Sequence, residues 1–198
     1  MALSSSEVYI ANTGHYFVAD LGTAKPADLP QTGASADALA WTPTGGYEEV
    51  GHTSQDSPLT ITRDGGDRTT NGSWQAPNLE ESVAPITYAL GFTLIQQDFL
   101  GLSLYYGGGS VDETDGNFIA PRVPAAQQKV LLAQIIHSSG TRCKWYWLPK
   151  VSILGSDNSE AATDDFMGLP VSASILDSAG EANEIAGLFK VSLQATGS

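Results

Sequence analysis

Apolar and polar residues alternate with a period of two along much of the chain, as in strands that bury one face. The clearest case is residues 86–94. Large apolar side chains fall at Ile86, Tyr88, Leu90, Phe92 and Leu94, and small or mildly polar ones at Thr87, Ala89, Gly91 and Thr93. The alternation predicts a mainly β protein in which this strand has one core face and one small, mild face.

Other segments extend the pattern. Residues 129–138 are apolar on both faces, which predicts a central strand covered twice, and residues 143–147 form the next strand of a hairpin. In residues 167–175, Pro170 predicts an edge strand or a bulge, because proline has no N–H to donate to a sheet. Residues 188–193 are expected to form the last strand, before a disordered tail at 194–198.

One segment, 98–106, predicts a helix. Asp98 is placed to cap its start and the glycines from Gly107 end it. We expect this helix to pack on a sheet through Phe99, Leu102 and Tyr106. With 198 residues, the chain is expected to form a single domain spanning 1–198.

Composition limits where the protein can act. Hydrophobic residues make up 41% of the chain without a run of about 18, so we expect no membrane insertion. Residues 1–10 lack a signal-peptide pattern and Cys143 is the only cysteine, so we expect assembly in a reducing cytoplasm. A formal net charge of −13 argues against DNA affinity.

Signatures of catalysis and ligand binding are missing from the sequence. There is no Gly-x-Ser-x-Gly nucleophile motif, and His15, His52 and His137 are isolated from one another. The acidic turn 112–116 lacks the ligand spacing of an EF-hand, and Gly107–Ser110 has no lysine after it. We therefore expect no enzyme activity, no catalytic residues, no cofactor and no metal site.

A series of short motifs resembles a known family. The series comprises Val8-Tyr9-Ile10-Ala11, Gly22-Thr23-Ala24-Lys25-Pro26, Tyr47-Glu48-Glu49-Val50-Gly51-His52-Thr53-Ser54, Asp64-Gly65-Gly66-Asp67, Gly72-Ser73-Trp74-Gln75 and Leu102-Ser103-Leu104-Tyr105-Tyr106-Gly107. In this order and spacing they resemble the major tail tube subunits of long-tailed (siphovirus-type) bacteriophages that infect actinobacteria. The resemblance ends near Ser110, beyond which only a general pattern of strands continues.

The resemblance implies a fold and an inter-subunit element. The expected fold is two packed antiparallel sheets, a β-sandwich or half-barrel, with one short flanking α-helix and long loops. Residues 1–22 would form N-terminal strands or an arm, and 63–75 an extended loop or hairpin that contacts a neighbouring subunit. The inter-subunit candidates are Arg63, Asp64, Gly65, Gly66, Asp67, Arg68 and Trp74.

The resemblance also implies a function. Six copies would close into a ring, and rings would stack into a hollow virion tail tube that conducts DNA during ejection without binding it specifically. Partners would be the protein itself, the tape measure protein, the tail tip or baseplate and the tail terminator. Mild strand faces, where no Lys or Arg would hold phosphates, make Thr87, Thr93, Ser172 and Ser174 the candidates for the lumen.

Other functions remain open from the sequence. A carbohydrate-binding β-sandwich module would share the strands and could use the four tryptophans as a sugar platform. A hydrolase is a weaker alternative. Among phage structural proteins, a head decoration protein or a tail terminator is the nearest alternative, and each of these forms closed assemblies.

Overall fold

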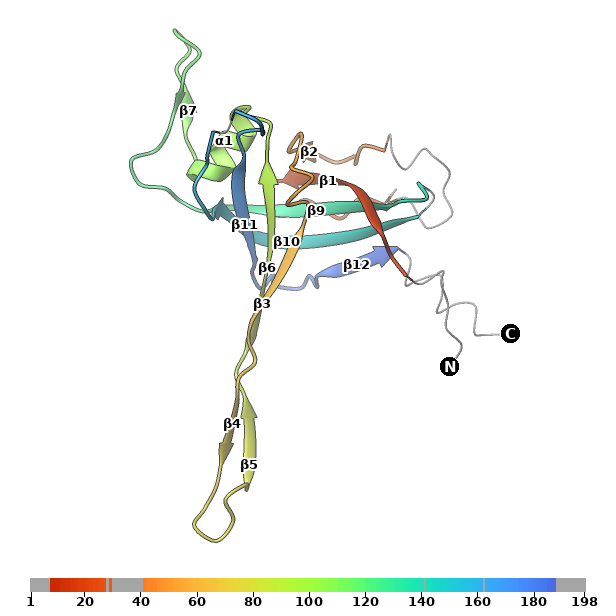
Figure 1. The fold of residues 1–198 in the computed structure, drawn as a ribbon, viewed down its shortest axis with the longest axis vertical. Coiled ribbons are helices and arrows are strands. Elements are labelled where there is room, and N and C mark those ends of the chain that lie inside the picture. The colour runs from red at the N-terminus through yellow and green to blue at the C-terminus, as the bar shows by residue number, and fades with distance from the viewer. Residues whose placement is uncertain (1–7, 28, 30–40, 141, 162, 188–198) are drawn as a thin grey trace, which may run out of the picture.

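One continuous antiparallel sheet organises the chain (Figure 1), seen in a computed structural model that describes residues 8–27, 29, 41–140, 142–161 and 163–187. Its strand order is β2-β1-β9-β10-β11-β6-β3, with β12 also paired to β10. These strands are β1 (Ala11–Ala19), β2 (Glu48–Glu49), β3 (Thr60–Gly65), β6 (Ile86–Leu94), β9 (Gln127–His137), β10 (Cys143–Gly155), β11 (Leu169–Ile175) and β12 (Glu184–Gly187). Two small hairpins, β4 (Arg68–Asn71) with β5 (Glu80–Val83) and β7 (Ser110–Val111) with β8 (Phe118–Ile119), lie outside it.

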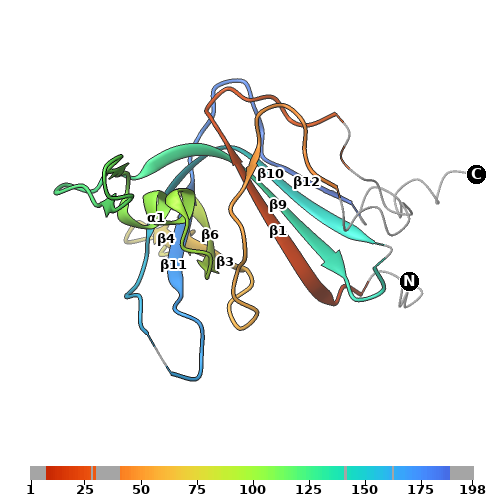
Figure 2. The same ribbon diagram turned by 90° about the horizontal axis from the view of Figure 1, so that it is seen from above.

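The sheet bends at β10 into two layers. The register of β10 against β9 shifts between Leu148 and Val151. Before the shift β10 pairs with β12, and after it β10 pairs with β11. We call β2-β1-β9-β10 the first half-sheet and β10-β11-β6-β3 the second half-sheet; Figure 2 shows their strands running in different directions.

The main core lies between the two half-sheets. Buried side chains of β1, β9 and β10 meet those of β6 and β11, and the rings of Tyr16 and Phe92 stack with centroids 4.4 Å apart. The expected mainly β, antiparallel fold with two packed layers and one helix is therefore confirmed. The layers are halves of one sheet that does not close into a barrel.

A second core covers the opposite face of the first half-sheet. Trp145 packs against Trp41, with ring centroids 4.7 Å apart, and Trp147 Nε1 donates a hydrogen bond of 3.0 Å to the Tyr47 hydroxyl. Burial raises the pKa of that Tyr47 hydroxyl. Cys143 is buried in the same cluster. The predicted central strand and its hairpin partner are confirmed as β9 and β10, and β9 is covered on both faces because two cores meet it.

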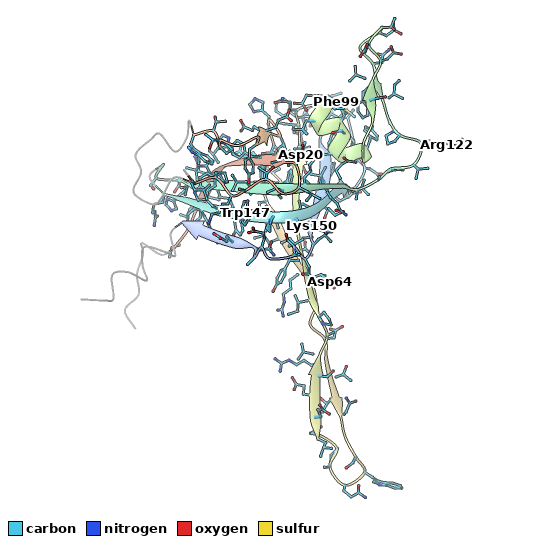
Figure 3. All side chains as sticks on the ribbon, turned by 180° about the vertical axis from the view of Figure 1, so that it is seen from behind. Asp20, Asp64, Phe99, Arg122, Trp147 and Lys150 are labelled. Carbon is cyan, nitrogen blue, oxygen red and sulfur yellow. The ribbon has the colours of Figure 1, made fainter. Side chains whose placement is uncertain are left out.

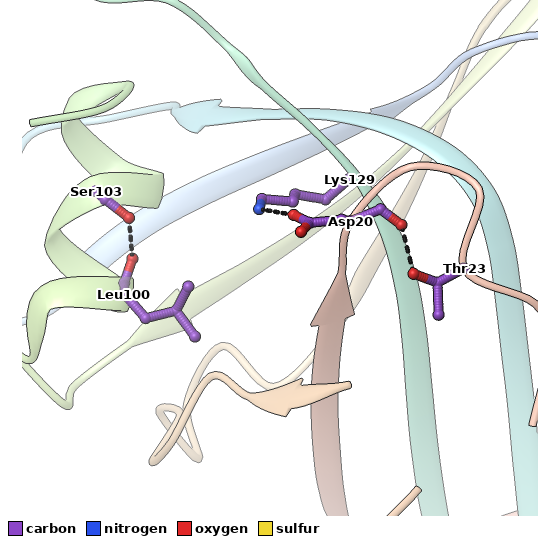
Figure 4. Close-up of polar contacts among 5 residues, drawn as sticks. All are labelled: Asp20, Thr23, Leu100, Ser103 and Lys129. Carbon is purple, nitrogen blue, oxygen red and sulfur yellow. Dashed lines mark hydrogen bonds and ion pairs between the residues drawn. The ribbon is translucent and has the colours of Figure 1, made fainter. Parts of the chain in front are cut away.

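The helix α1 (Phe99–Tyr106) begins and ends as predicted. Asp98 Oδ1 accepts a hydrogen bond of 2.8 Å from the Gly101 N–H, and Gly107 ends the helix with φ 71°. The helix packs on the sheet as expected, and Leu102 of the expected face contacts the main core. The other two expected residues are wrong, because Leu104 is the fully buried side chain, whereas Phe99 is 50% and Tyr106 39% exposed. Figure 4 shows the Ser103 hydroxyl donating to the Leu100 carbonyl at 2.8 Å.

A polar contact fixes the end of β1 next to β9. Lys129 Nζ lies 2.7 Å from Asp20 Oδ1, and the Thr23 hydroxyl donates to the Asp20 carbonyl (Figure 4). The Lys129 ammonium holds the pKa of the Asp20 carboxyl below its usual value. This contact joins the residue that follows β1 to the neighbouring strand β9.

The edge position expected from Pro170 is wrong, because β11 lies between β10 and β6. The Pro170 carbonyl accepts from the Ser156 N–H, one residue beyond the end of β10. The N and C=O of one residue in an antiparallel strand face the same neighbour, so the missing N–H lies at the end of a strand pair. In the expected N-terminal segment the strand begins at Ala11. The expected last strand at 188–193 and the tail at 194–198 lie outside the described residues.

Candidate assembly surfaces

A long β-ribbon projects from the second half-sheet. We call residues 66–85 the arm; it contains β4, β5 and the tip between them, and joins the ends of β3 and β6 (Figure 1). Every residue of β4 and β5 is exposed, and at the tip Trp74 is 100% and Leu79 70% exposed. A ribbon of two strands without a core is marginally stable in water. A binding surface would therefore stabilise the arm.

Glycines permit the junction between the arm and β3. Gly65 and Gly66 have φ of 81° and 80°, in the left-handed region that favours glycine. Gly65 pairs with Ile86, and Gly66 and Asp67 lie opposite Pro85 and Ala84, where the Ala84 N–H donates to the Asp67 carbonyl at 2.9 Å. A Cβ on Gly65 would lie 2.3 Å from the Pro85 carbonyl oxygen. The β3–β6 and β4–β5 pairs keep one register across this junction, and the close approach of Pro85 requires glycine at position 65.

The seven inter-subunit candidates lie along the end of β3 and the outgoing half of the arm. Arg63, Asp64 and Gly65 belong to β3, and Trp74 forms part of the tip. Arg68, expected to pair across an interface, lies 3.3 Å from Glu81 within its own arm. The sequence prediction of 63–75 identified the outgoing half and the tip but missed the returning strand β5. The sequence signal that could have revealed β5 is Ala84-Pro85. These residues interrupt the strand pattern just before Ile86, as Gly65-Gly66 interrupts it at the end of β3.

Most side chains on the outward face of the second half-sheet are small and uncharged. Register places Thr60, Gly91 and Ser172 in one row across β3, β6 and β11, and Thr62, Ala89 and Ser174 in the next. We call this surface the hydroxyl face, and its outward positions are Thr60, Thr62, Thr87, Ala89, Gly91, Thr93, Ser152, Leu154, Pro170, Ser172 and Ser174. Asp64 continues it on β3 where the arm begins, and Lys150 lies beside the shift in β10.

The four lumen candidates therefore share one face. Thr87 and Thr93 come from β6, and Ser172 and Ser174 from β11, its paired neighbour. Thr87 and Ser174 are exposed, and the other two are partly buried. Sequence reasoning missed Thr60 and Thr62, because it did not pair β3 with β6. The alternation of Thr60 and Thr62 with Ile61 could have indicated a strand with a hydroxyl side.

Two grooves and the histidines are the other candidate ligand sites. A groove of about 1020 Å³ lies between β1 and residues 51–59, and one of about 770 Å³ lies beside residues 157–168. In the first, His15 Nδ1 is 2.7 Å from Glu49 Oε1. Within the described ranges, no three His, Cys, Asp or Glu side chains are grouped to hold a metal. Nor does that part of the chain contain a helix long and apolar enough to cross a membrane.

A sugar platform has little support from the tryptophans. Trp145 and Trp147 are buried in the second core, and Trp41 packs against them. Trp74 is separated from these three at the arm tip. A flat aromatic platform needs several exposed rings together, which the described tryptophans do not provide.

Comparison with known proteins identifies the family of the chain. The phage tail tube protein family matches residues 1–189. The chain is 33% identical over 181 residues to the major tail protein Gp23 of Mycobacterium phage D29, covering 89% of this chain and 88% of that protein. It is 31% identical over 180 residues to the major tail protein Gp23 of Mycobacterium phage L5, with the same coverage. The chain belongs to the family of phage tail tube proteins.

The arm junction gives a first prediction. In Gly65→Ala, the added methyl group would clash with the Pro85 carbonyl, and alanine disfavours the left-handed φ of this position. The β4–β5 pairing of the arm should therefore be lost, while the rest of the protein, which we call the body, stays folded. Trypsin should then cut at Arg68 several-fold faster, with an unchanged unfolding midpoint. Gly116→Ala is the control, because Gly116 also has a positive φ (68°) but no atom within 4 Å of the added Cβ. Equal cleavage in the two variants would contradict the account.

Proposed function

We propose that this protein is the structural subunit of a phage tail tube, in which six copies close into a ring and rings stack around a continuous channel. The observation that supports this most directly is the second half-sheet. It has a core on one face, the hydroxyl face on the other and the arm at one end. Such a subunit has a surface to enclose a channel and an extension to reach another copy.

The open sheet edges support ring formation. In the described part of the chain, β3 pairs with β6 alone, so its other edge has free backbone donors and acceptors. An open edge is a template for pairing with another chain. Closing half-sheets from six copies into one barrel would satisfy these edges and place one sheet face inside. The proposed inner face is the hydroxyl face.

The chemistry of the hydroxyl face suits DNA passage. Its eleven named positions have no charged side chain, and the charges that adjoin them are Asp64, which pairs with Thr87, and Lys150, two residues before Ser152 in β10. With one base per copy, the face has few cations to pair with phosphates. The formal net charge of −13 per chain adds a repulsive background. DNA would therefore move through the tube without specific binding during ejection.

The proposed role is mechanical, without a catalytic step or a cofactor. Tubes would assemble in the host cytoplasm and remain in the virion tail. The tape measure protein would occupy the growing tube, and the tail tip or baseplate and the tail terminator would bind its two ends. The arm, including Arg68 and Trp74, would contact a neighbouring copy together with Arg63 at the end of β3.

Removing the arm tests the inter-subunit role. Gly65 pairs with Ile86, so replacing residues 66–85 by Asn-Gly gives a two-residue hairpin between β3 and β6. This variant should fold with an unfolding midpoint close to that of the full-length protein and form no tubes in negative-stain electron microscopy. The full-length protein, concentrated with a tail initiation complex, should form hollow rods. Tubes of normal appearance from the shortened protein would exclude the proposed role of the arm.

Adding cations tests the inner face. Thr87→Arg with Ser174→Arg places two guanidinium groups per copy on the hydroxyl face. Tubes assembled from this variant in the presence of DNA should retain it against nuclease and release it as salt increases, because each phosphate contact adds about −0.9 to the salt slope. Unmodified tubes should retain none. The control is Ala161→Arg, which adds a guanidinium group to an exposed loop. If tubes of the control retained as much DNA, the hydroxyl face would not be the inner face.

A further inference from the structure

Two exposed apolar patches lie at opposite ends of the fold without the arm, and the arm extends beyond one of them (Figure 1). We propose that the patch at the base of the arm in one copy packs against the patch beside α1 in the next copy along the tube. The inference rests on the proposed function, in which copies stack, and adds which surfaces meet. Figure 1 shows the arm and the β7–β8 hairpin extending in opposite directions along the longest axis.

The arm patch is an extension of the core face of β6. Ile86 and Tyr88 alternate with outward residues and so face the same side as the buried Leu90. Ile61, which pairs with Leu90, shares that side. Beyond the body nothing in the described chain covers this face: Ile86 is 37%, Tyr88 44% and Ile61 48% exposed. These three side chains are the arm patch.

The cap patch is formed by α1 and the β7–β8 hairpin. The Phe118 ring packs between Phe99 and Tyr106, with centroids 6.1 and 5.8 Å away. Val111 pairs with Phe118 and therefore faces the same side. Phe99 is 50%, Val111 45% and Tyr106 39% exposed. The cap patch is these four residues, held together by aromatic packing but open to solvent.

The charges beside the two patches are complementary. Arg63 pairs with Tyr88 and so places a guanidinium on the arm patch. The turn of the β7–β8 hairpin contains Asp112, Glu113 and Asp115. The Thr114 N–H donates to Asp112 Oδ1 at 2.8 Å and lowers the pKa of that carboxyl, which keeps it charged. Figure 3 labels Phe99 at the cap end and Asp64 where the arm leaves the body.

The positions of the two patches indicate that each is covered by a second copy of the chain. Patches at opposite ends of one chain cannot meet each other within that chain. Pairing two arm patches would bring two Arg63 side chains together, and pairing two cap patches would bring two acidic turns together. A head-to-tail contact joins unlike patches and leaves one of each free, which is the arrangement that grows into a filament. It also removes both apolar patches from water.

Cross-linking tests this pairing. Tyr88→Cys and Val111→Cys each place one thiol at the centre of a patch, and native Cys143 is buried with its pKa raised by burial, so it should not react. After assembly with a bis-maleimide, a mixture of the two single variants should give cross-linked dimers, and the double variant should give a ladder. Thr87→Cys, on the opposite face of β6, is the matched control and should not cross-link to Val111→Cys.

A charge rescue gives a second, independent readout. Ile86→Asp and Phe99→Lys should each raise the concentration needed for assembly about tenfold, because each places a charge in an apolar contact. Combining them in one chain should restore assembly, because the new charges meet between copies.

The outcomes separate the two proposals. Normal tubes without cross-links between positions 88 and 111, or dimers from either single-cysteine variant alone, would overturn the pairing and leave the tube. The absence of tubes from the unmodified chain with a tail initiation complex would overturn both.

Discussion

The pairing of β6 with β11 and β3 is the constraint on which the rest of the structure depends. It aligns Leu90, Phe92 and Leu94 with Val171 and Ala173 on one face, where they pack against the first half-sheet. Because a strand has a period of two, the same register places small and hydroxyl side chains on the other face. A shift of one residue would exchange these faces and leave the core polar. The core and the proposed channel wall are thus set by one register.

The same strands also determine where the chain can extend. Ile86 and Tyr88 continue the apolar face of β6 beyond the body. At the same end of the sheet, β3 continues through Gly65 and Gly66 into the arm, a ribbon without a core. An apolar face that continues past its own core has to be covered by another surface or remain in water. The arm and the exposed base of β6 are therefore parts of one feature, which a single chain leaves incomplete.

Much of this fold follows from the sequence because the signals are local. Alternation located β6, β9 and β10, and the Asp98 cap and Gly107 located α1. The face of α1 was mispredicted because apolar side chains surround this short helix, so no side is distinguished. The returning half of the arm was missed because β5, Glu80–Val83, is too short and too polar to show an alternating apolar face. The edge position of β11 was mispredicted from Pro170. Its missing N–H lies where β10 ends, and the end of a neighbouring strand depends on the tertiary structure. The packing of Trp41 on Trp145 joins distant segments, and alternation cannot predict it.

Electron cryo-microscopy of assembled tubes, at a resolution that traces the strands, tests the central claim most directly. The account predicts a hollow tube in which β3, β6 and β11 of every copy surround the channel, with Thr87 and Ser174 pointing towards its axis. A tube whose channel is lined by the first half-sheet, or one in which Thr87 and Ser174 point to the outside, would contradict it.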